Sequence, residues 1–196
     1  MTLLVSFAYC QTGFGLTLYT TAIFGARGAA VFGFLMSFNA VVVLVSTPLL
    51  TRLTHNLSGP ASMGLGTGLY VIGFGMMAFH LNLALLMIST LIWTLGEVLW
   101  STNYGAYLAS HTPVNFRGRF QSIRELSFAS GRVFSPIICG AVITHMGVHI
   151  SWAFIALVSL VCTVGIAGLH RWDARIVEQA SASASNPSMA DSAQVR

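Results

Sequence analysis

Charged residues are scarce in this sequence, and lysine is absent altogether. Only 7% of the 196 residues are charged, whereas an ordinary soluble domain is about a quarter charged. A soluble protein could not cover its surface with so few charges, and 55% of the residues are hydrophobic. The scarcity of charge therefore excludes a soluble globular domain and indicates an all-α integral membrane protein. Nine arginines produce most of the net charge of +4, and so small a total charge gives no reason to expect a nucleic-acid partner.

The sequence also lacks the signatures of metal, disulfide and catalytic chemistry. The three cysteines lie in apolar segments, without CxxC or Cys/His spacing: Cys10, Cys139 and Cys162. His145 and His149 have the i,i+4 spacing of metal ligands, but Gly147 between them indicates a turn, and no acidic residue or cysteine accompanies them. The sequence has no HExxH motif, and no Ser/His pair or pair of aspartates stands at one predicted depth in the membrane. An intramembrane enzyme is therefore the least supported class of function. We expect no metal and no cofactor.

Long apolar runs are what the sequence contains. A helix needs roughly 20 residues to cross a bilayer, and six runs approach this length. The predicted spans cover about residues 2–24, 28–50, 59–79, 83–109, 119–144 and 148–169. The charge-free run of residues 1–26 is too long for the apolar region of a signal peptide, so we interpret it as a span. The remaining residues, 171–196, are first amphipathic and then rich in Ser and Ala, and we expect a largely disordered cytoplasmic tail.

The positions of the arginines predict the orientation of the spans. With six spans, one side of the membrane carries five of them: Arg52, Arg117, Arg119, Arg171 and Arg175. The opposite side carries only Arg27. Basic residues accumulate on the cytoplasmic side of membrane proteins. We therefore expect a multi-pass membrane protein with both termini in the cytoplasm.

Two opposite charges stand at matching positions on either side of the turn near Val114. Glu97 lies 17 residues before this turn, and Arg132 lies 18 residues after it. In an antiparallel helical pair both would lie about 25 Å from the turn, because a helix rises roughly 1.5 Å per residue. Charges at such depth usually face a bundle interior or a water-filled cavity. Two interpretations of Glu97 stay open, namely a structural ion pair with Arg132 and a carboxylate that recognises a cation or couples transport to protons.

Other polar residues within the spans are further candidates. Glu125 precedes Arg132 by two helical turns, so the two share a helix face and could extend a network to Glu97. Arg124 should point elsewhere, and two interpretations of it stay open: it reaches toward the cytoplasmic end, which we favour, or it contacts a substrate. Four uncharged residues could either face a cavity or make interhelical hydrogen bonds: Gln11, Asn39, Asn103 and Tyr104. Small residues, including the GxxxG pair Gly64 and Gly68, predict close helix packing.

The turn sequence Ala-Ser-His-Thr-Pro-Val-Asn-Phe-Arg-Gly-Arg (109–119) resembles the connection between helices ten and eleven of the major facilitator superfamily. The family pattern, a proline followed by Arg-Gly, is matched by Pro113 and by Arg117-Gly118-Arg119. The loop after the second span fits the family's basic/acidic loop motif only at Pro48 and Arg52, because the acidic residue is missing. The resemblance covers about residues 1–170 and corresponds to helices seven to twelve.

This resemblance implies half of a major facilitator fold, built from two inverted three-helix repeats. The family's substrate cavity lies between two such halves, so we expect a missing N-terminal half or self-association to complete it. Met1 stands at the head of the first span, without the connector that normally precedes helix seven, which suggests a split, truncated or mis-started reading frame.

The function implied by the resemblance is transport of a small organic molecule across the bilayer by alternating access. The pattern is most similar to bacterial drug and small-molecule exporters, which implies proton-coupled efflux across a bacterial inner membrane. In that scheme Glu97 is the coupling carboxylate and Arg132 its switching partner. Arg117, Gly118, Arg119 and Arg52 would brace the cytoplasmic gate or simply anchor the topology. A non-transporting membrane scaffold or regulator is the alternative.

Overall fold

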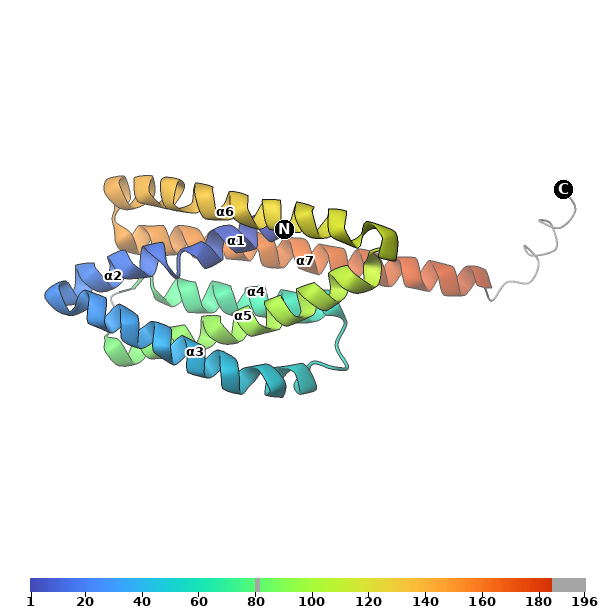
Figure 1. Ribbon diagram of the computed structural model, residues 1–196, viewed down its shortest axis with the longest axis horizontal. Coiled ribbons are helices and arrows are strands. Elements are labelled where there is room, and N and C mark those ends of the chain that lie inside the picture. The colour runs from blue at the N-terminus through green and yellow to red at the C-terminus, as the bar shows by residue number, and fades with distance from the viewer. Residues whose placement is uncertain (80–81, 185–196) are drawn as a thin grey trace, which may run out of the picture.

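The computed structural model describes residues 1–79 and 82–184, and within these ranges it contains helices and no β-strand. The elements are α1 (Thr2–Cys10), α2 (Phe14–Phe24), the 3₁₀ turn η1 (Gly25–Arg27), α3 (Gly28–Leu53), α4 (Gly59–Met76), α5 (Leu83–His111), the 3₁₀ turn η2 (Val114–Phe116), α6 (Arg117–Met146) and α7 (Val148–Ala184). The helices run along one common direction as an elongated bundle (Figure 1). The predicted all-helical class is confirmed.

Short polar and glycine-containing segments set the helix ends. The Ser58 hydroxyl accepts a hydrogen bond from the Ala61 amide at the start of α4, and the Asn82 side chain accepts one of 2.9 Å from the Leu85 amide at the start of α5. Gly147 ends α6 with a φ of 90°, a conformation that favours glycine. These caps allow each connection to reverse the chain within a few residues.

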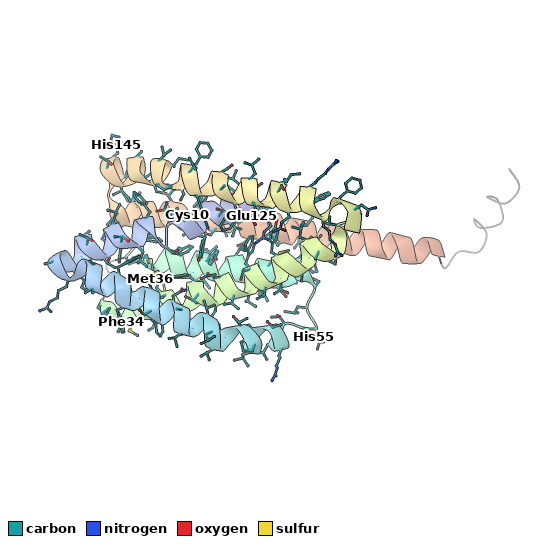
Figure 2. All side chains as sticks on the ribbon, in the orientation of Figure 1. Cys10, Phe34, Met36, His55, Glu125 and His145 are labelled. Carbon is teal, nitrogen blue, oxygen red and sulfur yellow. The ribbon has the colours of Figure 1, made fainter. Side chains whose placement is uncertain are left out.

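The connections alternate between the two ends of the bundle. The α3–α4 loop, the α5–α6 turn and the C-terminal end of α7 lie at one end, and the α2–α3 and α6–α7 turns lie at the other (Figure 1). His55 and His145 mark these opposite ends (Figure 2). The predicted arginine-rich connections therefore lie together, and the side of the membrane that they face stays a prediction.

Membrane-crossing capacity is clearest for part of the chain. Among the described residues, four segments are long and apolar enough to cross a bilayer: Thr2–Leu53, Leu83–Ser110, Arg117–Met146 and Val148–Arg171. The first has 52 residues and contains α1, α2 and α3. Helix α4, in which six of the 18 residues are glycine, falls outside this group. The chain is a multi-pass membrane protein, and the count of six spans stays a prediction.

The first predicted span is interrupted rather than continuous. Helix α1 ends at Cys10 and α2 begins at Phe14, and the Leu16 amide bonds the Gln11 carbonyl across 2.9 Å, one residue wider than in an α-helix. The buried Gln11 side chain donates a 2.6 Å hydrogen bond to the Ser135 hydroxyl of α6. The interruption is therefore fastened to a neighbouring helix.

Helix α4 occupies the centre of the packing, against α5 and α7. Its aromatic residues join a buried cluster in which the Phe74 ring lies 6.0 Å from Trp93 of α5 and 5.6 Å from Trp152 of α7. Backbones approach most closely at glycines: a Cβ on Gly66 of α4 would lie 2.7 Å from the carbonyl oxygen of Gly96 of α5. Small residues thus decide which helices meet.

The structure corrects the expectation that α5 and α6 pack as a simple hairpin. Helix α5 packs mainly on α4 and α3, whereas α6 packs mainly on α1 and α7. The physical reason is the position of the small residues. Gly96 lets the backbone of α5 approach α4 closely, and Gly131 lets the backbone of α6 approach Ser6 of α1. Bulky and charged side chains occupy the space between α5 and α6 instead.

Helix α7 continues beyond the predicted end of the last span. It runs through Ala184, although the apolar run predicts a span that ends near residue 169 and a tail that begins at 171. The first part of the predicted tail is therefore helical, and it extends past the other helices (Figure 1). The prediction of a disordered end falls on residues 185–196, which lie outside the described residues.

Candidate functional site

A cavity of about 260 Å³ lies among α1, α4, α5 and α6. It contains three charged side chains among largely aromatic and apolar neighbours. Its lining residues are Val5, Tyr9, Tyr70, Glu97, Trp100, Ser101, Arg124, Phe128 and Arg132. A cavity that combines a few charges with apolar walls has the character of a small-molecule site.

Glu97 is held in this cavity by neutral hydrogen-bond donors. The Tyr9 hydroxyl of α1 donates a 3.0 Å hydrogen bond to Oε1. The Asn39 amide of α3 donates to Oε2 across 3.3 Å and to the Thr94 hydroxyl across 2.8 Å. Three helices therefore fix the position of one carboxyl group, and both of its oxygens have a partner without an ion pair.

Arg132 lines the same cavity but does not pair directly with Glu97. Within the described residues, the only ion pair with a nitrogen–oxygen distance of 4.0 Å or less joins Arg124 to Glu125. The Arg132 guanidinium instead lies over the Phe128 ring of its own helix, with Cζ 5.3 Å from the ring centroid. The expected direct ion pair is not formed, because α5 and α6 pack mainly on other helices and the cavity lies between the two residues.

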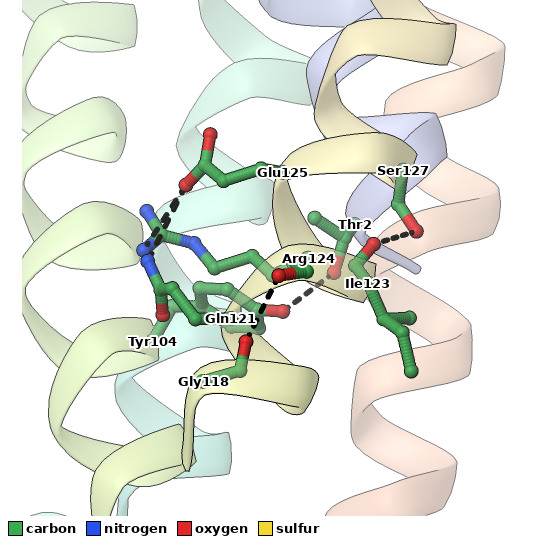
Figure 3. A network of polar contacts seen from close by, with 9 residues as sticks. Thr2, Tyr104, Gly118, Gln121, Ile123, Arg124, Glu125 and Ser127 are labelled. Carbon is green, nitrogen blue, oxygen red and sulfur yellow. Dashed lines mark hydrogen bonds and ion pairs between the residues drawn. The ribbon is translucent and has the colours of Figure 1, made fainter.

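Glu125 pairs with its sequence neighbour rather than with Arg132. Arg124 Nη1 lies 3.6 Å from Glu125 Oε1, and Gln121 donates to the same oxygen across 3.4 Å (Figure 3). The Glu125 side chain is 62% exposed and does not line the cavity. The predicted network from Glu125 through Arg132 to Glu97 is therefore absent from the described structure.

Arg124 enters the cavity instead of pointing away from it. Its guanidinium lies over the Tyr104 ring (Figure 3), with Cζ 5.5 Å from the ring centroid. The Tyr104 ring stacks on Trp100, with their centroids 4.7 Å apart. Thr2 of α1 donates a 2.9 Å hydrogen bond to the Tyr104 hydroxyl. The expectation that Arg124 reaches to the membrane surface is wrong, because the aromatic pair on α5 holds the guanidinium at the cavity wall.

Two of the uncharged candidates lie elsewhere. The Gln11 amide is buried between α1 and α6, where it donates to the hydroxyl and carbonyl of Ser135. Asn103 donates to the Leu99 carbonyl and lines a different surface hollow, beside Pro60 and Tyr107. Of the four uncharged candidates, Asn39 contacts Glu97 directly and Tyr104 supports Arg124.

The predicted gate residues lie at the connection-rich end of the bundle and are exposed. Arg117 donates a 3.4 Å hydrogen bond to the Ala109 carbonyl, which closes the α5–α6 turn. Arg119 lies 5.6 Å from the Phe116 ring, and Gly118 has open space beside it. Arg52 lines a shallow hollow with Pro48 and His55 at the end of α3. These contacts are local and do not reach the cavity.

Sequence reasoning missed Tyr9 and assigned Arg124 to the wrong environment. Tyr9 stands in a charge-free run, so nothing in its local sequence points to the half-buried carboxyl group of Glu97, 88 positions away. Arg124 carries only a weak signal, because eight residues place it about 80° around the helix from Arg132.

A family model described as the Major Facilitator Superfamily matches residues 1–189. The chain belongs to the Major Facilitator Superfamily. This match confirms the resemblance carried by the turn between residues 109 and 119. This membership points to a transport protein rather than to an enzyme. No curated protein matches the sequence.

Solved transporter structures share the fold. A peptide transporter POT in complex with sulfate matches with a TM-score of 0.73 and 18% identity, over 85% of this chain and 35% of that one. A POT family transporter in complex with 5-aminolevulinic acid matches with a TM-score of 0.69 and 18% identity, over 85% and 39%. The chain therefore spans little more than a third of the length of these transporters.

Proposed function

We propose that this chain is the C-terminal six-span half of a transporter that moves a small organic molecule by alternating access, in exchange for protons. In the complete transporter, α1, α2, α3, α5 and α6 would face a second half, supplied by another segment or by a second copy. The protein would reside in a bacterial inner membrane with both termini in the cytoplasm. The exporter-like turn at residues 113–119 supports efflux as the direction.

The observation that carries this proposal is the environment of Glu97. A carboxyl group in an apolar segment is costly and usually functional. Here its oxygens accept hydrogen bonds from Tyr9 and Asn39, and no arginine of the described residues neutralises it within 4.0 Å. A carboxyl group supported by neutral donors can lose or gain a proton without breaking an ion pair. It also lies beside the cavity, where a bound solute would contact it.

The bundle also offers a place where movement would alter this environment. Tyr9 lies immediately before the interruption at Gln11–Gly13, so rotation of α1 relative to α2 would displace the Tyr9 hydroxyl from Glu97. Interrupted helices at the midplane form the binding and coupling sites of several transporter folds. Proton exchange at Glu97 and rearrangement of α1 would then be linked.

The test is solute-dependent proton movement. The protein produced from its complete gene is reconstituted into liposomes that contain a pH-sensitive dye, and a panel of small organic solutes is added one at a time. We expect at least one solute to change the lumenal pH, and Glu97→Gln to abolish this change while membrane insertion persists. Unaltered proton movement in Glu97→Gln would remove the coupling role from this residue.

The matched control separates coupling from binding. Solute–solute exchange across the membrane needs alternating access but no net proton movement, so Glu97→Gln should retain exchange. Loss of exchange and of proton movement together would indicate a damaged fold instead. If no solute in the panel moved in either assay with the wild-type protein, the transport proposal would be replaced by a scaffold or regulatory role. Comparison of inside-out with right-side-out vesicles gives the direction.

A further inference from the structure

We infer that the cavity recognises the anionic group of its solute through Arg132 and Arg124, and that the solute is a small organic acid with an apolar, ring-bearing body. This inference deepens the proposed function, because it names the class of solute for the same cavity. It depends on the balance of charges around the cavity and on the composition of its walls.

The charges that line the cavity do not cancel. Glu97 contributes one negative charge, and its oxygens are occupied by Tyr9 and Asn39 rather than by an arginine. Arg132 lies over the Phe128 ring and has the uncharged Cys10 thiol as a side-chain neighbour, with no acidic side chain of the described residues within 4.0 Å. A guanidinium in a membrane-spanning helix normally has a counter-ion, since an unpaired charge there is costly. The missing counter-ion is what a bound anion would supply.

Arg124 has capacity for a second contact. Its bond to Glu125 is long, at 3.6 Å, and uses one nitrogen of the guanidinium. Its buried Nε has no hydrogen-bond partner among the described residues. Arg124 and Arg132 are eight residues apart on α6, which separates their backbones by about 12 Å, and their long side chains both reach the cavity. Guanidinium groups bind carboxylates and other oxyanions in preference to neutral groups.

The remaining walls suit an apolar body. Tyr9, Tyr70, Trp100 and Phe128 surround the charged groups, together with Val5 and Ser101. A volume of about 260 Å³ admits a molecule with one ring and a short side chain. The cavity thus combines an apolar chamber with a cationic wall on α6, a combination that favours an aromatic acid over the corresponding amide or amine.

The test uses three probes that share one skeleton: phenylacetate, phenylacetamide and phenethylamine. Binding to the protein produced from its complete gene, in detergent or nanodiscs, is titrated through tryptophan fluorescence, since Trp100 lines the cavity. We expect saturable binding of phenylacetate, with weaker binding of the neutral amide and of the amine. Arg132→Gln should weaken phenylacetate binding by about 10- to 100-fold, the value of a charge-assisted hydrogen bond.

Two further variants make the result specific. Arg132→Lys keeps the charge but loses the two-pronged geometry, so it should retain part of the affinity that Arg132→Gln loses. Arg27→Gln removes the same charge from an exposed position in the α2–α3 turn, outside the cavity, and should bind phenylacetate as the wild type does. Equal weakening by Arg27→Gln would indicate a general charge effect and would overturn the inference.

The outcomes also separate this inference from the proposed function. If phenylacetate does not bind, or if phenylacetamide binds equally well, the inference is overturned. The counter-ion of Arg132 would then come from the other half of the transporter. Proton-linked movement of a cationic or neutral solute would then leave the transport proposal intact. Conversely, selective phenylacetate binding that is lost in Arg132→Gln, without movement of any solute, would retain the anion site and refute transport.

Discussion

The hydroxyl of Tyr9 donates a 3.0 Å hydrogen bond to Oε1 of Glu97, and 88 positions of the sequence separate the two residues. The bond joins α1, just before its interruption, to the middle of α5. It gives the carboxyl group a neutral partner on the helix segment that precedes the interruption. This contact therefore connects the proposed proton site with the proposed moving element.

Replacing Tyr9 by Phe removes this hydroxyl and keeps the ring. A hydrogen bond to a charged group contributes about 1.5–3 kcal/mol, so we expect solute-linked proton movement to fall by about 10-fold or more. The rate in dye-loaded liposomes measures the effect. Tyr19→Phe is the control, because its hydroxyl bonds the Phe79 carbonyl in the packed core. Wild-type rates in Tyr9→Phe would show that the contact has no part in coupling.

Asn39 should contribute to stability as well as to the site, since its amide bonds both Thr94 and Glu97 of α5. We expect Asn39→Ala to lower the free energy of unfolding in the bilayer by about 1–2 kcal/mol, the scale of two interhelical hydrogen bonds. Ser37→Ala is a matched control on the same helix, because that hydroxyl bonds only the Gly33 carbonyl one turn earlier. Equal stability losses in the two variants would contradict the bridging role.

The candidate site illustrates what the sequence can and cannot predict. A lone acid in an apolar run has to face a protein interior or a cavity, so the sequence alone is enough to single out Glu97. It is not enough to identify the partners of this acid, because the matched-depth argument for Arg132 assumes that α5 and α6 pack together. The helix that supplies Tyr9 is far away in the sequence, and the glycines that bring α4 to α5 and α1 to α6 decide the neighbours.

Glycine positions in α4 provide a direct test of this packing. The sequence draws attention to the GxxxG pair Gly64 and Gly68, yet a Cβ on Gly68 would contact only Thr163, at 4.0 Å. A Cβ on Gly66 would instead lie 2.7 Å from the Gly96 carbonyl oxygen. We expect Gly66→Ala to destabilise the fold by about 1–3 kcal/mol through overpacking, and Gly68→Ala to be nearly neutral. Unfolding in mixed micelles measures both. A larger loss in Gly68→Ala would mean that the GxxxG face is the closer contact.

The same comparison explains why the fold class was predictable and the helix partners were not. Scarce charge and long apolar runs indicate membrane helices whatever their arrangement. A stripe of small residues shows that some backbone approaches closely, but α4 carries glycines on more than one face. Only the positions of Trp93, Trp100 and Ser89 on α5 determine that Gly66 and Gly73 form the tight contact.

Gln11 offers a final prediction, about the interruption between α1 and α2. Its amide donates to the Ser135 hydroxyl at 2.6 Å and to the Ser135 carbonyl at 3.2 Å, and the same hydroxyl donates to the Phe7 carbonyl at 2.6 Å. If these hydrogen bonds hold α1 against α6, the Gln11 and Ser135 side chains should be energetically coupled. In a double-mutant cycle of Gln11→Leu and Ser135→Ala, we expect a coupling free energy of about 0.5–1.5 kcal/mol.

The cycle also distinguishes a fastening from a cavity residue. Because Gln11 is buried outside the cavity, Gln11→Leu should leave the affinity for a bound solute unchanged while it lowers the free energy of unfolding. Ser135→Ala should behave in the same way, since its hydroxyl bonds the Phe7 carbonyl and the Gln11 amide, both away from the cavity. Additive stability losses combined with weakened solute binding would instead place Gln11 at the solute, and the interruption would then be part of the binding site rather than a hinge beside it.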